Sequence, residues 1–255
     1  MVGQQLHQST TSISLVRSIA GLVVTFTIAS AVLYYLLSLV ARQLSMRASA
    51  LFPTNVDQLK ELTVALDDVK DERFGLILSS FCAVYIFKQS FAIPGSVLTN
   101  ILGGALFGMW LGFPLVCLLS ASGSTCCYLL SRTFGKHIVL RYQQERIKKL
   151  EDLMLESQSS LVFFLLSLRL FPVTPNWLLN MASPIVGVPI LPFFISVFIG
   201  LMPYNFICVH AGLVISNLKS TAELFEVSTI LKLIALSLLM VTPGIVLKIQ
   251  KSKRR

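Results

Sequence analysis

The sequence has few charged side chains and few groups that do acid–base or metal chemistry. Only 13% of its 255 residues are Asp, Glu, Lys or Arg, and its three histidines, His7, His137 and His210, lack the spacing of metal ligands. It contains no nucleophile–base pair, carboxylate dyad or phosphate-binding loop. We therefore expect no enzyme activity, no cofactor and no metal site.

Disulfide chemistry is not indicated either. The cysteines are five, an odd number, and all lie inside apolar segments, where cysteine usually packs as a small hydrophobic residue. They are Cys82, Cys117, Cys126, Cys127 and Cys208. We expect neither a disulfide framework nor thiol catalysis.

Apolar side chains are what the sequence has in excess. Hydrophobic residues make up 55% of the chain and its mean hydropathy is +0.77, which is more apolar surface than one soluble core hides. The net charge of +9 comes from basic tracts beside apolar runs, which indicates contact with lipid headgroups and no nucleic acid partner. The composition predicts an all-α integral membrane protein that interacts with membrane phospholipids.

The chain divides into an anchor, a membrane domain and a tail. Residues 1–52 are expected to form the anchor and a linker, 53–247 the membrane domain and 248–255 a basic cytosolic tail. The apolar run 19–40 can span a bilayer and precedes Arg42 and Arg47, so we expect a retained anchor with a lumenal N-terminus. Stretches 53–73 and 137–156 predict amphipathic interfacial helices, the first of which is also compatible with a packed connector.

Two interruptions of the apolar sequence carry the functional interpretation. They are Phe-Ala-Ile-Pro-Gly at 91–95 and Phe-Pro-Val-Thr-Pro-Asn at 171–176. Hydrocarbon cannot hydrogen-bond backbone groups, so irregular backbone at membrane depth is stable only where it is buried in protein or faces a wet cavity. Broken segments in both halves of a chain indicate a path or binding site near the bilayer midplane.

Charge placement leads to a predicted topology. Basic residues follow the first span, recur in the tract 132–149 and end the chain. If all three regions are cytosolic, an even number of membrane crossings separates each region from the next. One of the pieces 74–93, 95–113 and 114–131 must then return to the side it entered from, and so must 161–190. With spans at 191–215 and 228–247, we expect about five transmembrane helices and two opposed re-entrant helical hairpins, arranged as an inverted repeat.

Polar and helix-breaking residues near the two interruptions are the candidates for a lipid path. Arg169 either attracts phosphate or clamps hairpin carbonyls, and the prolines and Asn176 either contact lipid or only shape the backbone. Leu98-x-Asn100 and Leu178-x-Asn180 form a faint repeat, although the spacing to the preceding proline differs by one residue. The candidates are Pro94, Gly95, Ser96, Asn100, Arg169, Pro172, Thr174, Pro175, Asn176 and Asn180.

Glycines recur every four residues in the piece after the first interruption. Gly104, Gly108 and Gly112 are expected to form a smooth helix face that admits another backbone closely, in preference to a direct role in substrate contact.

Several ordered motifs are shared with a known family. These are Phe-Ala-Ile-Pro-Gly-Ser at 91–96, Gly-Gly-Ala-Leu-Phe-Gly at 103–108, Leu-Arg-Leu-Phe-Pro-x-x-Pro-Asn-Trp at 168–177 and Pro-Tyr-Asn-Phe at 203–206. Over residues 54–247 the chain resembles the DedA superfamily, and more narrowly the transmembrane protein 41 group, relatives of vacuole membrane protein 1.

The resemblance implies a passive, ATP-independent phospholipid scramblase of the endoplasmic reticulum, linked to autophagosome formation, lipid droplets and lipoprotein export. Bacterial relatives resemble proton-coupled carriers of lipid phosphates and tend to have an acidic residue in the first hairpin. This chain has Gly95-Ser96 there and no acid in either predicted hairpin, which argues against proton coupling.

The last five residues contain a second signal. Lys251 and Lys253 have the spacing of a dilysine retrieval signal, which coat proteins would read on a cytosolic tail and which would retain the protein in the endoplasmic reticulum. An ordinary positive-inside stop explains the charge equally well but not the spacing.

Two alternatives to scrambling stay open at this point. One is ion-coupled secondary transport of a lipid phosphate or another anion. The other is a non-transporting membrane scaffold that binds lipid-transfer proteins through the helices at 54–73 and 137–156.

Overall fold

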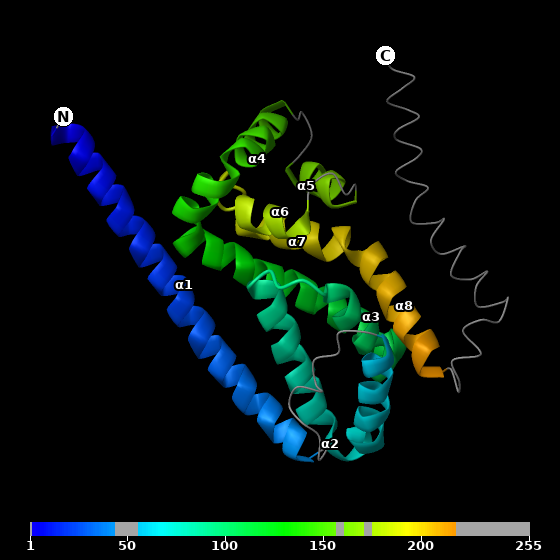
Figure 1. Cartoon of the computed structure of the whole chain (residues 1–255). Coiled ribbons are helices and arrows are strands. Elements are labelled where there is room, and N and C mark those ends of the chain that lie inside the picture. Colours follow the sequence, from blue (N-terminus) through cyan, green and yellow to red (C-terminus); the bar gives the residue numbers. More distant parts are fainter. Residues whose placement is uncertain (1, 44–55, 157–160, 171–174, 218–255) are drawn as a thin grey trace, which may run out of the picture.

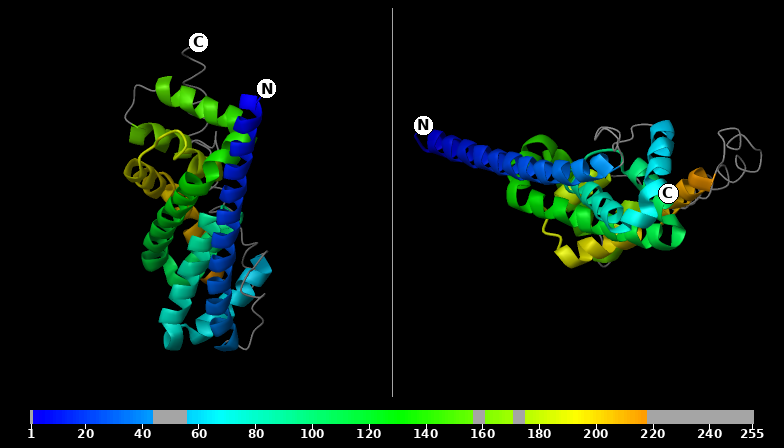
Figure 2. Two further views of the ribbon diagram at one scale, coloured as in Figure 1. Left: turned by 90° about the vertical axis from the view of Figure 1, so that its left-hand side faces the viewer. Right: turned by 90° about the horizontal axis from the view of Figure 1, so that it is seen from below.

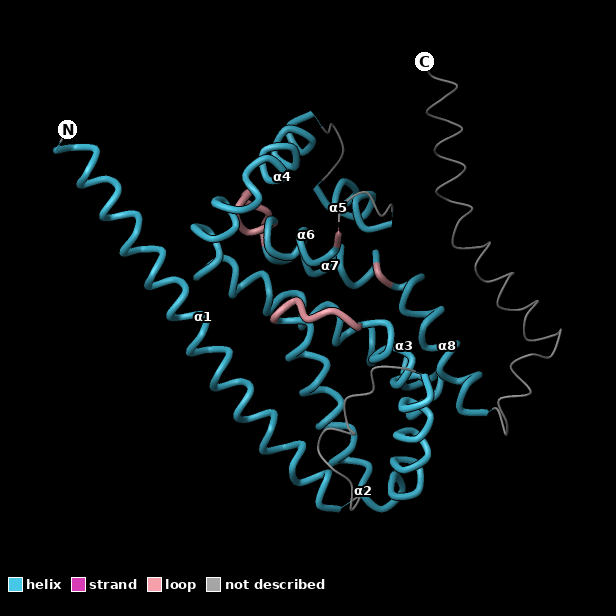
Figure 3. The backbone as a smooth tube through the Cα atoms, viewed as in Figure 1, coloured by secondary structure: helices cyan, strands magenta, loops and turns pink. Residues whose placement is uncertain are grey.

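The computed structural model describes residues 2–43, 56–156, 161–170 and 175–217, and it has no strand within these ranges (Figures 1 and 3). The predicted all-α class is confirmed. The helices are α1 (Val2–Gln43), α2 (Val56–Ser90), α3 (Ser96–Leu130), α4 (Lys136–Glu156), α5 (Leu161–Leu170), α6 (Asn176–Ala182), α7 (Ile190–Gly200) and α8 (Met202–Asn217), with a π-helical turn, η2 (Ser131–Gly135), between α3 and α4. The predicted span 228–247 and the tail lie outside the described residues.

Two of the described helices are long and apolar enough to cross a bilayer, namely Leu15–Arg42 of α1 and Ser96–Gly135, which comprises α3 and η2. The first agrees with the predicted span 19–40. In place of the single predicted segment 191–215, α7 and α8 form a pair bent by 43° at Leu201. Helix α5 has only ten residues, about 15 Å of rise, which is half the thickness of the hydrocarbon layer.

Helix α2 changes direction at the boundary between its amphipathic and apolar parts. Arg73 has non-helical backbone angles (φ −130°, ψ 29°) at the end of the charged run 70–73. The segment before it corresponds to the predicted amphipathic helix, and the segment after it to the apolar piece beginning at Phe74. The predicted boundary is confirmed.

Helix α3 bends at a different residue from the one expected. The sequence suggested separate pieces joined between Phe113 and Pro114, but the break falls at Gly108, with φ 66° and ψ −170°. Such a conformation is open to glycine and strained for residues with a Cβ. Pro114 lies inside the second segment of α3 without a comparable break, although proline cannot donate a backbone hydrogen bond.

The bend at Gly108 separates the three glycines that were expected to share one helix face. A Cβ on Gly104 would clash with the backbone carbonyl of Val209, and one on Gly212 with the carbonyl of Ile101, so α3 and α8 are in backbone contact. A Cβ on Gly112 would instead lie 2.7 Å from the Gly103 carbonyl oxygen, within α3 itself. Gly104 and Gly112 therefore serve two different close contacts, and Gly108 is the turn.

Helix α3 runs through the centre of the molecule (Figures 1 and 2). The residues of α3 from Leu102 to Leu119 contribute to an apolar core shared with α1, α2 and Val209 of α8. Ala121 and Tyr128, further along α3, belong to another core formed with α4, α5, α6 and α7. Polar residues on α3 are thus placed where the two halves of the chain meet.

Two parts of α1 contact different halves of the protein. Leu37 and Val40, near its C-terminal end, belong to the core shared with α2, whereas Gly21, near the start of the apolar stretch Leu15–Arg42, lies against Phe134 of η2, next to α4 (Figures 1 and 2). Arg42 and Arg132, which the parity argument places on one side of the membrane, therefore lie near opposite ends of the apolar stretch Leu15–Arg42.

Candidate functional site

Two asparagines occupy matching positions after the two interruptions. Helix α3 begins at Ser96 after the left-handed Gly95 (φ 103°), and α6 begins at Asn176 after Pro175. Asn100 and Asn180 are each the fifth residue of their helix, and their side chains are only 0% and 3% exposed. A buried amide requires partners, because an unsatisfied donor or acceptor costs about 1–3 kcal/mol.

Asn100 belongs to a group of four residues that we call the asparagine network. Its Oδ1 accepts a hydrogen bond of 2.7 Å from the Tyr85 hydroxyl, and its Nδ2 donates one of 3.0 Å to Asn205 Oδ1. Ser120 closes the group, 2.6 Å from the Tyr85 hydroxyl and 3.3 Å from Asn205 Nδ2. The network joins α2, α3 and α8.

Asn180 belongs to a second group, which we call the arginine network. Its Oδ1 accepts hydrogen bonds from both terminal nitrogens of Arg169, at 3.3 and 3.2 Å, and its Nδ2 donates to Ser124 Oγ at 3.1 Å. Arg169 Nε donates to Ser196 Oγ at 3.3 Å, and its guanidinium lies 5.1 Å from the centre of the Phe193 ring. The guanidinium is thus held by neutral acceptors and an aromatic face.

The arginine network reaches the first interruption through one hydroxyl. Gln89, at the end of α2, donates a hydrogen bond of 2.9 Å to Ser124 Oγ, the same atom that accepts from Asn180. Ser120 of the asparagine network precedes Ser124 by four residues, which is about one turn on the same helix face. The two interruptions therefore lead to neighbouring positions on the middle of α3.

Some residues of the predicted path are at the surface and others are enclosed. Pro94, Gly95, Pro175 and Asn176 are exposed and Ser96 is half-buried, whereas Asn100, Arg169 and Asn180 are buried. Asn176 Oδ1 lies 3.5 Å from Arg169 NH1, which connects the surface to the arginine network. Pro172 and Thr174 lie outside the described residues.

Sequence reasoning missed more than half of this arrangement. The candidates did not include Tyr85, Gln89, Ser120, Ser124 and Asn205, and a hydroxyl within an apolar run often bonds only to its own helix. The spacing of Ser120 and Ser124 was an available signal, since it places two hydroxyls on one face of a spanning helix.

Apolar helices of spanning length around buried polar side chains define a polytopic helical membrane protein. The VTT domain model matches residues 93–214, which include both asparagines and Arg169. The chain is 36% identical to a transmembrane protein 41 homolog of Caenorhabditis elegans over 79% of this chain and 82% of that protein, and 35% identical to human transmembrane protein 41B over 81% and 71%. It belongs to the transmembrane protein 41 family.

A transmembrane protein 41 homolog of Dictyostelium discoideum is 37% identical over 77% of this chain, and the aligned region spans 59% of that relative's length. No solved structure matches the chain. The family resemblance noted from the motifs is confirmed, and the chain is an integral membrane protein of the DedA superfamily.

Proposed function

We propose that the protein is a passive, ATP-independent phospholipid scramblase of the endoplasmic reticulum membrane that redistributes lipid for autophagosome formation, lipid droplets and lipoprotein export. The observation that carries the proposal is the meeting of the two buried networks on α3. We define the polar seam as eight of the polar residues that these hydrogen bonds join: Tyr85, Gln89, Asn100, Ser120, Ser124, Arg169, Asn180 and Asn205.

A scramblase must lower the cost of moving a charged headgroup through hydrocarbon while the acyl tails stay in lipid. Amide and hydroxyl groups suit this task because they both donate and accept hydrogen bonds. Exchanging one such partner for another costs little, since the net value of a hydrogen bond is about 1 kcal/mol, whereas leaving a group unpaired costs more. A headgroup that enters the polar seam replaces internal partners one at a time.

The charges of the polar seam favour phosphate and do not provide proton coupling. Arg169 is the one ionised side chain among the eight residues, and a guanidinium binds phosphate well. No Asp or Glu stands among them. The exposed Asn176, in contact with Arg169, marks the entrance from the surface.

The test is lipid equilibration in vesicles that contain the purified protein and a fluorescent phospholipid in both leaflets. A membrane-impermeant reductant should quench the probe of both leaflets when the protein is present and only the outer probe in protein-free vesicles. The expected rate is the same without a gradient and with an imposed proton or sodium gradient. Equilibration that requires a gradient would favour coupled anion transport, and inert vesicles would favour the scaffold.

The location in the endoplasmic reticulum is proposed from the tail, which lies outside the described residues. Replacing Lys251 and Lys253 by alanine should release the protein to later compartments if the spacing acts as a retrieval signal. Unchanged location of this variant would leave the tail as a positive-inside stop.

A further inference from the structure

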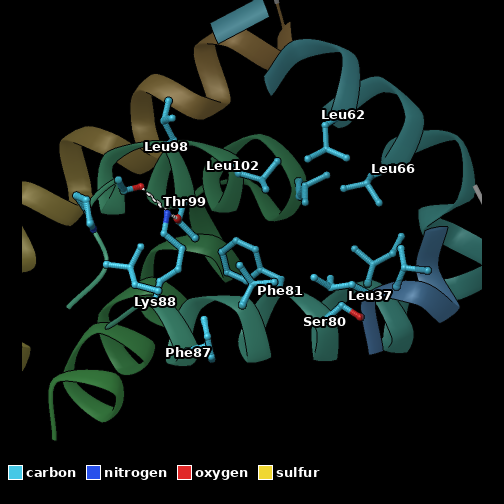
Figure 4. Close-up of a pocket in the computed structure, with 17 residues that line it drawn as sticks. Leu37, Leu62, Leu66, Ser80, Phe81, Phe87, Lys88, Leu98, Thr99 and Leu102 are labelled. Carbon is cyan, nitrogen blue, oxygen red and sulfur yellow. Dashed lines mark hydrogen bonds between the residues drawn. The ribbon is translucent and has the colours of Figure 1, made fainter. Parts of the chain in front are cut away.

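A separate cavity of about 500 Å³ lies beside the first interruption (Figure 4). Its lining includes none of the eight residues of the polar seam. Its walls come from α1, both segments of α2, the loop 93–95 and the first segment of α3. Nearly all of the lining is aliphatic or aromatic; Ser80, Lys88 and Thr99 supply its polar side chains. Walls of this composition favour hydrocarbon over water.

The size of the cavity fits one acyl chain. A methylene group occupies about as much space as a water molecule, about 30 Å³, so the cavity has room for about 17 such groups. Two long chains do not fit in this volume. The walls therefore enclose one chain of a ligand, and a second chain would have to lie outside them.

One end of the cavity carries a positive charge. Lys88 Nζ donates hydrogen bonds of 2.9 Å to the Gly95 carbonyl and to Thr99 Oγ1, both of which are neutral (Figure 4). An ammonium group has three protons, so one is left for a ligand. Among the described residues that line the cavity none carries a carboxylate, and Gly95 beside the ammonium is exposed, so an anion can approach from the surface.

A second polar atom of the lining has no partner in the protein. Ser80 Oγ is buried, with 6% of the residue exposed, and makes no hydrogen bond to any other described residue. It lies on the same helix as Lys88, about two turns before it, and the flexible lysine stem covers part of the separation. The oxygen itself is covered, so a rotation of the Ser80 side chain about χ1 would turn it toward an oxygen-bearing group between the head and the tail of a ligand.

We propose that this cavity binds a single-chain anionic lysophospholipid, with its phosphate at Lys88, its ester oxygens near Ser80 and its chain toward Leu62 and Leu66. Each part of the ligand corresponds to one observation. The phosphate corresponds to the charge of Lys88, the ester oxygens to the unpartnered Ser80 hydroxyl, and the chain to the volume enclosed by the apolar walls. The site does not depend on scrambling, because a protein that binds this lipid and moves none would still possess it.

The experiment measures binding of four lipids to the purified full chain by native mass spectrometry, with thermal unfolding as a check on folding. Lysophosphatidate should bind most tightly. Lysophosphatidylcholine lacks the net charge, oleate lacks phosphate and ester, and phosphatidate carries a second chain, so each should bind about tenfold more weakly. Equal binding of any of the three would overturn the corresponding contact and with it the proposed ligand.

Variants distinguish lipid bound in the cavity from lipid that surrounds the protein without a specific site. Lys88→Gln, which keeps a donor for Gly95, should weaken lysophosphatidate about tenfold and leave lysophosphatidylcholine unchanged, and Lys88→Arg should retain most of the affinity. Leu66→Trp fills the far end and should abolish binding of both. The exposed Lys148→Gln is the matched control and should bind as the unmodified chain does. Unaltered binding by folded Lys88→Gln and Leu66→Trp variants would exclude this cavity as the binding site.

Ser80→Ala gives an independent readout. Because the hydroxyl has no partner in the protein, its removal should leave the unfolding temperature of the lipid-free chain unchanged or higher. Affinity for lysophosphatidate should nevertheless fall several-fold. A variant that loses stability without loss of affinity would show that Ser80 serves the fold alone.

Discussion

The side-chain amide of Asn180 donates a hydrogen bond of 3.1 Å to the hydroxyl of Ser124, across 56 positions of the sequence. The amide of Gln89 donates to the same oxygen at 2.9 Å. A hydroxyl has two acceptor lone pairs, so Ser124 is fully used by two residues that come from the two broken segments. The side chains of the two broken segments thus meet at a single oxygen atom on α3.

Ser124→Ala should destabilise the protein by about 2 kcal/mol, because it leaves the buried amide of Asn180 and the half-buried amide of Gln89 without their acceptor. Thermal unfolding in detergent or nanodiscs measures the effect. Thr125→Ala is the control at the next position, where the hydroxyl bonds only to the Ala121 carbonyl of its own helix, and it should shift stability by about 0.5 kcal/mol or less. Similar losses in both variants would contradict the bridging role.

Arg169→Lys should be nearly as damaging as Arg169→Gln, although it keeps the charge. The guanidinium contacts Ser196, Asn176 and Asn180 from different nitrogens, and an ammonium cannot reproduce that fork. Both unfolding and lipid equilibration should show the loss. The exposed Arg132→Lys should be neutral. If Arg169→Lys is stable and scrambles normally, Arg169 contacts phosphate as a point charge and is not a clamp.

Gly104→Ala and Gly212→Ala should each destabilise by about 2 kcal/mol or more, because the added Cβ meets a backbone carbonyl of the opposing helix, which cannot move aside. Gly75→Ala is the matched control: it lies in α2, and nothing stands within 4 Å of its Cβ position. Alanine there should be neutral or stabilising by up to about 1 kcal/mol. Tolerance of alanine at position 104 would mean that α3 and α8 are further apart.

The fold and the parity argument predict different membrane sides for two turns of the chain. The charged turn at Glu72 and the π-helical turn at Arg132 lie near opposite ends of the apolar stretch Leu15–Arg42, so single cysteines at these positions, in a background without native cysteines, should react with an impermeant maleimide from opposite sides. Reaction from the same side would restore the prediction that both regions are cytosolic.

The sequence predicted elements better than it predicted contacts. Hydropathy located the span in α1 and the boundary at Arg73, because both depend on local composition. It missed the bend at Gly108, since glycine at that spacing also suits helix packing. It also identified Asn100 and Asn180 through their position after the breaks, but their partners Asn205 and Ser124 lie 105 and 56 residues away and leave no local pattern.

The claim that headgroups cross along the polar seam is tested most directly by the double variant Asn100→Leu, Asn205→Leu. These two residues bond to each other, and Tyr85 and Ser120, which also contact them, keep each other as partners. Replacing both asparagines by apolar side chains of similar size is therefore close to neutral for folding. In gradient-free vesicles, the account predicts a folded protein whose rate of leaflet equilibration falls by about tenfold or more, the factor expected when about 1.4 kcal/mol of headgroup stabilisation is lost at the barrier. A folded double variant that equilibrates lipid at the unmodified rate would contradict it.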